Sequence, residues 1–302
     1  SSVQPGFVVS KVSIIIPCFK QAHFLGEAID SALTQTHPDL EVIVIDDGSP
    51  DHTSAVAAGY VADPRFKYVR QENRGLPAAR NRGIEESTGD YLCFLDSDDT
   101  FAPTKVARQA ALLDADPSLG FVYCDIVTID ETGCAVPDQF SIASTQRELS
   151  GNVFGSLMLG GYFPPHTVMI RRSILDALGG FDPELGGHAD YELWLRVSGA
   201  GHRAAFVAEA LANYRVHGGS MSKDGEHMHA TRLATLVKMA RLYPERFASG
   251  ADLLQQSMSD LFKANQWMRR QQEETPGAGF GGATGDAGED SSSESYPLLR
   301  HF

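Results

Sequence analysis

The stretch Tyr91-Leu-Cys-Phe-Leu-Asp-Ser-Asp-Asp99 decides how the rest of the chain is interpreted. An apolar run ends abruptly in three carboxylates, those of Asp96, Asp98 and Asp99. This pattern is typical of a buried strand whose C-terminal end opens into a cleft. Clustered carboxylates repel one another, and a hard divalent cation such as Mg²⁺ or Mn²⁺ would relieve that repulsion. The alternative is a solvated turn that caps a helix starting near Pro103.

Two further apolar strands precede this stretch. Val12–Pro17 and Glu41–Asp46 are nearly all apolar, as strands buried on both faces are, and residues 23–35 between them carry helical periodicity. Strand, helix and strand in this order predict a right-handed, parallel βαβ unit, and such sheets bind ligands at the carboxyl ends of their strands. We therefore expect three segments to converge at one edge of the sheet: Pro17–Lys20, Asp46–Ser49 and Asp96–Asp99.

The remaining pattern continues this alternation. Helices are expected at 53–62, 77–87, 103–116, 149–160 and 171–178, and strands at 66–70, 91–95, 120–126, 167–170 and 204–207. Residues 128–150 are polar and predict an irregular segment or a short hairpin over the cleft. The sequence therefore predicts an α/β fold with a mostly parallel central sheet flanked by helices.

Composition narrows the functional class. The chain has 302 residues and a net charge of −14, which argues against a nucleic-acid partner. Its four cysteines form no Cys-x-x-Cys pair, and three lie in or beside apolar runs, as buried free thiols do. No apolar run is long enough to span a membrane, and we find no signal peptide.

Four motifs occur in one order and carry a family resemblance. They are Ile14-Ile-Ile-Pro-Cys-Phe-Lys20, Val44-Ile-Asp-Asp-Gly-Ser49, Glu72-Asn-Arg-Gly75 with Ala79-Arg-Asn-Arg-Gly83, and Leu95-Asp-Ser-Asp-Asp99. Together they resemble the inverting family-2 glycosyltransferases, which have a GT-A fold, over about residues 11–222. The resemblance implies a GT-A domain over 1–222, with a nucleotide-sugar-binding half at 11–126 and an acceptor and catalytic half at 127–222.

The resemblance assigns the nucleotide-binding residues one by one. Phe19, with Pro17 beside it, matches the aromatic residue that lies against the base. Asp47 matches the carboxylate that accepts a hydrogen bond from the base, uracil or another nucleobase with an imino N–H, and a UDP-sugar donor is favoured. Asp46 is its structural neighbour, and Arg80 is a basic residue near the nucleotide. The alternatives are a core position for Phe19 and, for Arg80, a surface ion pair with Glu85 or Glu86.

The resemblance also implies a divalent metal cofactor, Mn²⁺ or Mg²⁺. Asp98 matches the metal-ligating aspartate, and Asp96 matches the carboxylate beside it that contacts the ribose or the metal. His217, in Tyr214-Arg-Val-His217, matches a histidine that reaches the metal or the diphosphate. The alternative for His217 is a structural role. His166 either faces the acceptor or is structural.

A second chemical centre lies in Gly186-Gly-His-Ala-Asp-Tyr-Glu-Leu-Trp-Leu-Arg196. Asp190 matches the catalytic base of the family, which takes a proton from the acceptor hydroxyl as that hydroxyl attacks the anomeric carbon. Carboxylates at a helix start can instead be simple caps. Ala189 stands where the family has another acidic residue, and Glu192 is an alternative base.

The resemblance implies partners and a location as well. The acceptor is expected to be a glycan, a lipid-linked oligosaccharide or a protein, as in bacterial cell-surface glycan biosynthesis. The expected location is the bacterial cytoplasm, with peripheral association at the inner face of the membrane as an option. Residues 223–274 are expected to form a helical extension, and 275–302 a disordered, acidic, Gly/Ser-rich tail.

Two rival interpretations remain at this point. A sugar nucleotidyltransferase usually carries a glycine-rich, basic phosphate loop after its first strand, and Pro17-Cys-Phe-Lys20 is not one. A catalytically degenerate module of the same fold would bind a nucleotide or a glycan without transferring it. The only hint of such a module is Ala189.

Overall fold

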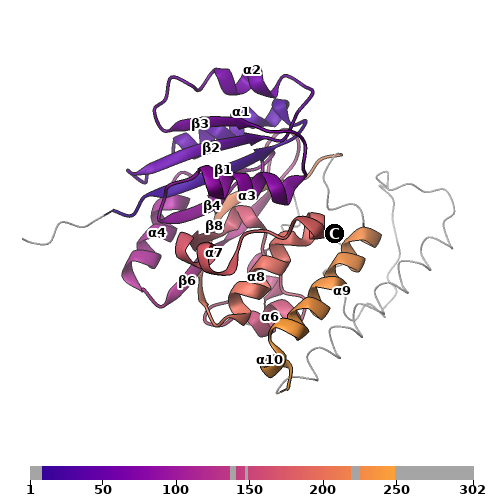
Figure 1. The fold of residues 1–302 in the computed structure, drawn as a ribbon. Coiled ribbons are helices and arrows are strands. Elements are labelled where there is room, and N and C mark those ends of the chain that lie inside the picture. The colour runs from indigo at the N-terminus through magenta and orange to yellow at the C-terminus, as the bar shows by residue number, and fades with distance from the viewer. Residues whose placement is uncertain (1–8, 137–140, 147–148, 219–224, 249–302) are drawn as a thin grey trace, which may run out of the picture.

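A computed structural model describes residues 9–136, 141–146, 149–218 and 225–248. Within them a single sheet of eight strands has the order β3-β2-β1-β4-β7-β6-β8-β5 (Figure 1). The strands are β1 Val12–Cys18, β2 Leu40–Asp46, β3 Phe66–Arg70, β4 Tyr91–Phe94, β5 Thr100–Phe101, β6 Leu119–Ile129, β7 Met169–Arg171 and β8 Arg203–Arg215. The helices are α1 Ala22–Leu33, α2 Thr53–Ala58, α3 Leu76–Glu86, α4 Lys105–Ala115, α5 Ile142–Thr145, α6 Phe154–Met158, α7 Arg172–Leu178, α8 Ala189–Gly199, α9 Gly225–Leu242 and α10 Pro244–Ala248, with 3-10 turns η1 Pro165–Thr167 and η2 Pro183–His188.

The sheet is mostly parallel, as the sequence predicts. Strands β3, β2, β1 and β4 are parallel neighbours, and β6 and β8 are parallel to each other. Strand β7 runs antiparallel to both β4 and β6, and β5 runs antiparallel to β8. The α/β expectation is therefore confirmed, and the carboxyl ends of β1, β2 and β4 lie at one edge.

The continuous apolar runs of the first strands follow from burial on both faces. In β2, Ile43 and Ile45 pack with Ala79 of α3 in one apolar cluster, whereas Val42 and Val44 belong to the main core. Successive side chains of a strand point to opposite faces, so each face of β2 needs apolar residues.

Two strands differ from the sequence prediction. β8 extends from Arg203 to Arg215 instead of ending near Val207, because it pairs along the length of β6 through several register shifts. β5 consists of two residues only, which is too short to leave a periodic pattern. The pairing of β5 with β8 joins Thr100 to Asn213 and thereby brings the turn after β4 beside the end of β8.

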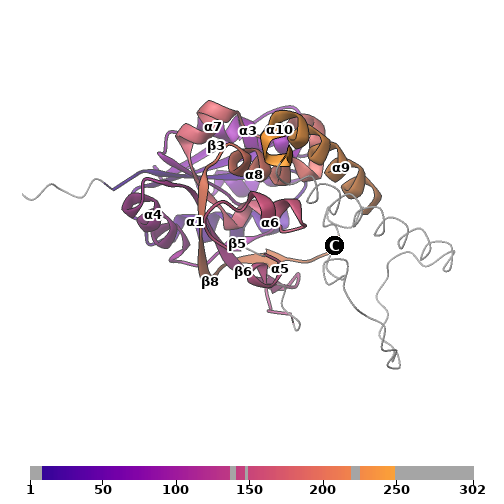
Figure 2. The same cartoon turned by 90° about the horizontal axis from the view of Figure 1, so that it is seen from below.

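Helix α9 lies beside α8 (Figures 1 and 2). Leu236 and Met239 on its inner side are fully buried, whereas Val237 and Leu242 are exposed. The rest of the expected helical extension, residues 249–274, and the expected tail at 275–302 lie outside the described residues. None of the helices within the described residues has the length and apolar character needed to cross a membrane.

All four cysteines of the chain are free thiols, as expected. Cys18, Cys93 and Cys124 are buried, and Cys134 is exposed. Cys134 lies in a hairpin that follows β6, in which Ile129 pairs with Ala135 and the Asp130 carboxylate accepts the Cys134 backbone N–H at 3.0 Å. The expected segment at 128–150 thus begins as a hairpin.

Candidate active site

The loops after β1, β2 and β4 meet at one edge of the sheet, as the βαβ pattern predicts. The Lys20 backbone N–H donates to Ser49 Oγ at 3.2 Å, which joins the first loop to the second. The side chain of Gln21 donates to Asp98 Oδ2 at 3.4 Å, which joins the first loop to the third. Three segments far apart in the sequence therefore form one site.

The first loop presents an aromatic ring to solvent. Pro17 is buried as part of β1, whereas the next aromatic residue, Phe19, is 40% exposed and has Lys20 Nζ 4.9 Å from its ring centroid. The alternative that Phe19 is a core residue is therefore wrong. An exposed ring beside a cation is suited to stacking against a planar ligand.

Asp46 at the end of β2 is fully buried and supports the loop that follows it. Its carboxylate accepts the Ser49 backbone N–H at 2.7 Å, the Tyr68 hydroxyl at 2.6 Å and an Arg70 N–H at 2.9 Å. These three bonds fix the start of the second loop.

Asp47 is bound mainly by the segment that leads into α3. It accepts the side-chain N–H of Gln71 at 2.8 Å and the backbone N–H groups of Arg74 at 2.9 Å and Gly75 at 2.8 Å. Gly75 has φ +87°, a conformation that glycine adopts without strain. The Asp47 carboxylate thus holds the second loop against the turn before α3, and because a carboxylate offers about four acceptor sites, one remains for a further donor.

The three aspartates after β4 face three different partners. Asp96 forms an ion pair with Arg80 at 2.6 Å, Asp98 with His217 at 2.9 Å, and Asp99 with His166 at 2.8 Å. None of them caps α4, whose N-terminal flanking residue is Thr104. The interpretation of this stretch as a solvated, helix-capping turn is therefore wrong.

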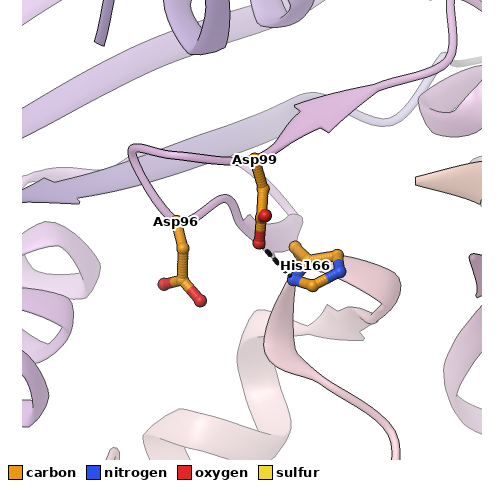
Figure 3. A group of neighbouring side chains, drawn as sticks. All are labelled: Asp96, Asp99 and His166. Atoms are coloured by element: carbon orange, nitrogen blue, oxygen red, sulfur yellow. Dashed lines mark ion pairs between the residues drawn. The ribbon is translucent and has the colours of Figure 1, made fainter. Parts of the chain in front are cut away.

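Two sets of these residues could contribute ligands to a cation. Figure 3 shows Asp96, Asp99 and His166, whose ligand atoms all lie within 4.8 Å of one another. The other set is Asp98 with His217, whose side chains are 19% and 8% exposed. Asp99 and His166 are only 2% and 1% exposed, and Asp99 also accepts the Arg215 backbone N–H at 2.7 Å. The first set is thus largely enclosed by protein, and the second is more open to solvent.

Burial and mutual repulsion alter the protonation of these groups. Burial raises the pKa of Asp98 to about 6, and the neighbouring charges of Asp99 and Asp96 act in the same direction. Burial by itself would lower the pKa of His166, but the charge of Asp99 outweighs it, and the pKa is raised. A carboxylate whose ionisation is opposed by neighbouring like charges, as that of Asp98 is, is suited to binding a cation.

Arg80 connects the turn Asp96–Asp99 after β4, the aspartate turn, to α8. Its side chain is 4% exposed and pairs with Asp96, while its guanidinium lies 5.2 Å from the ring centroid of Phe181. The surface ion pair with Glu85 or Glu86 is therefore wrong. Burial would lower the pKa of Arg80, but the charges of Asp96 and Asp190 outweigh it and raise the pKa.

Asp190 lies in the first turn of α8 and is buried. Its Oδ2 accepts the hydroxyl of Tyr162 at 2.7 Å, and its Oδ1 accepts the backbone N–H of Tyr191 at 2.6 Å. Burial raises the pKa of Asp190, although Arg80, Tyr162 and the Tyr191 N–H act to lower it. A carboxylate in this environment has the raised basicity that a general base requires.

Glu192 faces away from this network. It is fully buried and pairs with Arg196 on its own helix and with Lys238 on α9, each at 2.9 Å. Two cationic side chains hold the Glu192 side chain between the two helices, so the alternative that Glu192 is the base does not fit its position. Ala189, in place of the family's acidic residue, is fully buried in the core.

Three contacts of the site are not predicted from the sequence. The first two are Tyr162 with Asp190 and His166 with Asp99. The third is made by Arg215, whose backbone N–H bonds Asp99 of the aspartate turn and whose guanidinium lies 2.6 Å from the Glu27 carboxylate. Tyr162 and His166 stand four positions apart in Tyr162-Phe-Pro-Pro-His166, and this dense run of aromatic residues and prolines is the one local signal that could mark a rigid loop.

The chain is similar in sequence to known glycosyltransferases. The profile described as glycosyl transferase family 2 matches residues 13–179. An uncharacterized glycosyltransferase of Rickettsia prowazekii is 35% identical over 214 residues, which cover 68% of this chain and 64% of that protein. The amylovoran biosynthesis glycosyltransferase AmsB of Erwinia amylovora is 25% identical over 268 residues, 82% of this chain and 88% of that protein. This chain thus spans less than two thirds of the Rickettsia relative.

Solved structures share the fold at low sequence identity. The structure of S. aureus TarS 1–349 in complex with UDP-GlcNAc has a TM-score of 0.63 at 20% identity, covering 76% of this chain and 66% of that one. The mannosyltransferase PcManGT of Pyrobaculum calidifontis, in complex with GDP-Man and Mn²⁺, has a TM-score of 0.62 at 21% identity, covering 87% and 79%. The curled, mostly parallel sheet flanked by helices is the GT-A fold.

The profile match covers more than half of the chain, and it includes the segments that carry the aspartate turn and Arg80. The motifs, the fold and the relatives all agree. The chain belongs to glycosyl transferase family 2.

Proposed function

We propose that this chain transfers a sugar from a nucleoside-diphosphate sugar to an acceptor hydroxyl, with inversion at the anomeric carbon. The catalytic domain would span 1–222, and the helical residues that follow would support it. The observation that carries the proposal is the network Asp96–Arg80–Asp190, in which one buried cation lies between the carboxylate turn after β4 and a carboxylate of raised pKa on α8.

The donor would lie across the loops after β1 and β2. Phe19 is exposed and would stack on the base, with Pro17 beside it, while Asp47 would accept an imino N–H. Uracil and guanine both offer that donor, and the structural neighbours hold UDP-GlcNAc and GDP-Man. We favour a UDP-sugar. Asp96 would lie near the ribose, and Arg80, which pairs with Asp96, would lie near the nucleotide.

Asp98 and His217 would hold a divalent cation, with Asp96 as a further oxygen donor. The fit rests on the donor set, carboxylate oxygen with one imidazole nitrogen 2.9 Å away, and on the like charges that raise the pKa of Asp98. Neutralisation of the diphosphate charge is the chemistry that such a cation supplies when bound. PcManGT, a neighbour in fold, was solved with Mn²⁺.

The proposed step needs one base and no nucleophilic side chain. As the acceptor oxygen forms a bond to the anomeric carbon, its proton passes to the carboxylate of Asp190. The bond from that carbon to the diphosphate breaks, and the nucleoside diphosphate leaves with the electron pair. Positioning of the two reactants in line supplies much of the remaining rate enhancement.

The first test is ligand binding, measured as a rise in melting temperature. UDP, GDP, UDP-GlcNAc and GDP-mannose would each be added with and without Mn²⁺, to the wild type and to Asp98→Ala. A ligand that binds only the folded state raises the melting temperature. We expect a rise with one nucleotide that requires Mn²⁺ and is lost in the variant. No rise with any nucleotide would contradict the proposal.

The second test separates a transferase from a degenerate module. We expect the wild type to release nucleoside diphosphate from the donor that binds, and Asp190→Asn to bind that donor while losing about 10²–10⁴-fold in turnover. Asp176→Asn, an exposed carboxylate on α7, is the matched control and should retain activity. Donor binding without turnover in the wild type would favour the binding module. Formation of a nucleotide sugar from a sugar phosphate and UTP would instead indicate a nucleotidyltransferase.

A further inference from the structure

One loop contacts both chemical centres of the site. Residues 160–166 carry Tyr162, whose hydroxyl donates to Asp190 at 2.7 Å, and His166, which pairs with Asp99 at 2.8 Å. The proposed base on α8 and the aspartate turn after β4 are thus contacted by two side chains of a single short segment. A shift of this loop would alter both centres together.

The backbone on either side of Tyr162 is closely packed. A Cβ atom at Gly161 would lie 2.4 Å from the side-chain oxygen of Gln146 and 2.8 Å from the backbone oxygen of Ser156, so glycine is needed for this approach. On the other side, the ring of Phe163 stacks on Tyr123 with centroids 4.3 Å apart and lies 5.8 Å from that of Trp194. Packing on both sides fixes the position from which the Tyr162 hydroxyl reaches Asp190.

The hydroxyl of Tyr162 can act toward Asp190 only as a hydrogen-bond donor. Burial and the charge of Asp190 raise the pKa of Tyr162 well above its usual value, so the phenol keeps its proton. A carboxylate accepts hydrogen bonds and does not donate them. The bond therefore stabilises the ionised form of Asp190 and directs its Oδ2.

We infer that Tyr162 is a positioning residue for the base: its hydroxyl, held by the packed loop 160–166, orients the Asp190 carboxylate and keeps it ionised. This inference rests on the proposed role of Asp190. Tyr162 takes no proton and forms no bond to the sugar in this account, and it acts only through Asp190.

Other charged and titratable groups act on the same carboxylate. Arg80 from α3 favours its ionised form, whereas Asp96, after β4, opposes it. Tyr214 on β8 helps to raise the pKa of Tyr162. Because Arg80 and Asp96 stay in place when only the Tyr162 hydroxyl is removed, a Tyr162→Phe variant isolates the hydrogen bond.

The experiment is donor hydrolysis by the Mn²⁺-loaded full chain, with UDP-GlcNAc, UDP-glucose, UDP-galactose and GDP-mannose as probes. Water replaces the unknown acceptor and needs the same base. For Tyr162→Phe we expect kcat to fall about 10- to 100-fold, part of the ~10²–10⁴ that a general base contributes, with KM for the donor unchanged. The acid limb of kcat/KM should move to higher pH, because the carboxylate without its donor is more readily protonated.

Tyr123→Phe is the matched control. It also removes a tyrosine hydroxyl that donates a 2.7 Å hydrogen bond, here to the Leu149 carbonyl, and it lies under the same loop. A structural loss alone would lower the melting temperature of both variants and leave both pH profiles unchanged. An unchanged pH profile and kcat in Tyr162→Phe would therefore overturn the inference.

A measurement independent of turnover completes the test. The carboxyl carbons of the aspartates would be labelled with ¹³C and titrated by NMR, and the Asp190 signal would be assigned from its loss in Asp190→Asn. We expect its pKa to rise in Tyr162→Phe and not in Tyr123→Phe. An unmoved titration overturns the inference whatever the activity, whereas a wild type that hydrolyses none of the donors contradicts the proposed function.

Discussion

The Oδ2 atom of Asp98 lies 2.9 Å from Nε2 of His217, although 119 residues separate them in the chain. The short strand β5 accounts for this contact, because its pairing of Thr100 with Asn213 brings the residues on either side of it together. The Arg215 backbone N–H then bonds Asp99, and His217 reaches Asp98. Two residues of strand thus assemble a candidate cation site from distant parts of the sequence.

Asp98→Asn is expected to stabilise the protein when no metal is present. The folded-state pKa of about 6 lies above the usual 3.8, so ionised Asp98 destabilises the fold above about pH 6. That penalty disappears as the pH falls below the usual value, because Asp98 is then protonated in both states. A gain of about 1–3 kcal/mol in the free energy of unfolding is expected at neutral pH, and a smaller gain in acid.

Urea unfolding of Asp98→Asn in EDTA, at about pH 7.5 and about pH 4.5, measures this difference. The variant should also lose any stabilisation by Mn²⁺. Exposed Asp176→Asn on α7 is the control and should change neither quantity. A variant less stable than the wild type in EDTA would show that Asp98 is mainly a structural partner of His217.

His166→Gln is expected to lower stability more in mild acid than in mild alkali. The pKa of His166 is raised by Asp99 despite burial, so protonated His166 stabilises the fold below its usual pKa. This contribution is lost as the pH rises through the higher folded-state value. Because the pair is buried, we expect a loss of about 1.5–3 kcal/mol near pH 6 and less near pH 9.

Thermal unfolding of His166→Gln across this pH range, against exposed His52→Gln, provides the check. The difference in melting temperature between wild type and variant should shrink as the pH rises. If it stayed constant, His166 would be neutral throughout, and the pairing with Asp99 would be an uncharged hydrogen bond.

Lys238→Met is expected to loosen the contact between α8 and α9. Lys238 pairs with Asp182 at 2.6 Å and with the fully buried Glu192 at 2.9 Å, and Arg196 remains as a second partner of Glu192. We expect a loss of about 1–2 kcal/mol in the free energy of unfolding, measured by urea denaturation. Arg241→Met removes an exposed cation from the same helix and should cost little. Equal effects of both variants would mean that net charge, not this pair, matters.

Gly161, in the loop 160–166, and Gly155, in helix α6 before it, offer a paired test. Gly161→Ala would place a Cβ 2.8 Å from the Ser156 backbone oxygen, and we expect a loss of about 1–3 kcal/mol with reduced turnover as Tyr162 shifts. Gly155→Ala meets nothing within 4 Å and lies in α6, so it should be neutral or stabilising by up to about 1 kcal/mol. Melting temperatures give the sign for each. Tolerance of alanine at Gly161 would mean that the loop has room to adjust.

The fold was largely accessible from the sequence because its signals are local. The buried strand before Asp96 and the βαβ pattern around Asp46 depend on burial of neighbouring residues, which periodicity reports. Strand β8 was underestimated because most of its residues are exposed or partly exposed, and β5 is too short for any pattern.

The contacts of the site were less accessible because they depend on packing between distant elements. The sequence left a surface ion pair with Glu85 or Glu86, its neighbours on α3, as the alternative for Arg80, but its buried side chain pairs with Asp96. Tyr162 and Asp190 meet only because the loop 160–166 crosses the start of α8. No spacing rule within one chain predicts such a pair.

Exposed Cys134 gives the protein an intrinsic attachment point, since the other three thiols of the chain are buried. A maleimide dye would label the hairpin after β6 without any substitution. In that hairpin, Glu131 accepts the Gly218 backbone N–H at 3.3 Å, next to His217. The fluorescence of such a dye would therefore report, in real time, how the segment that bears His217 responds to donor and metal.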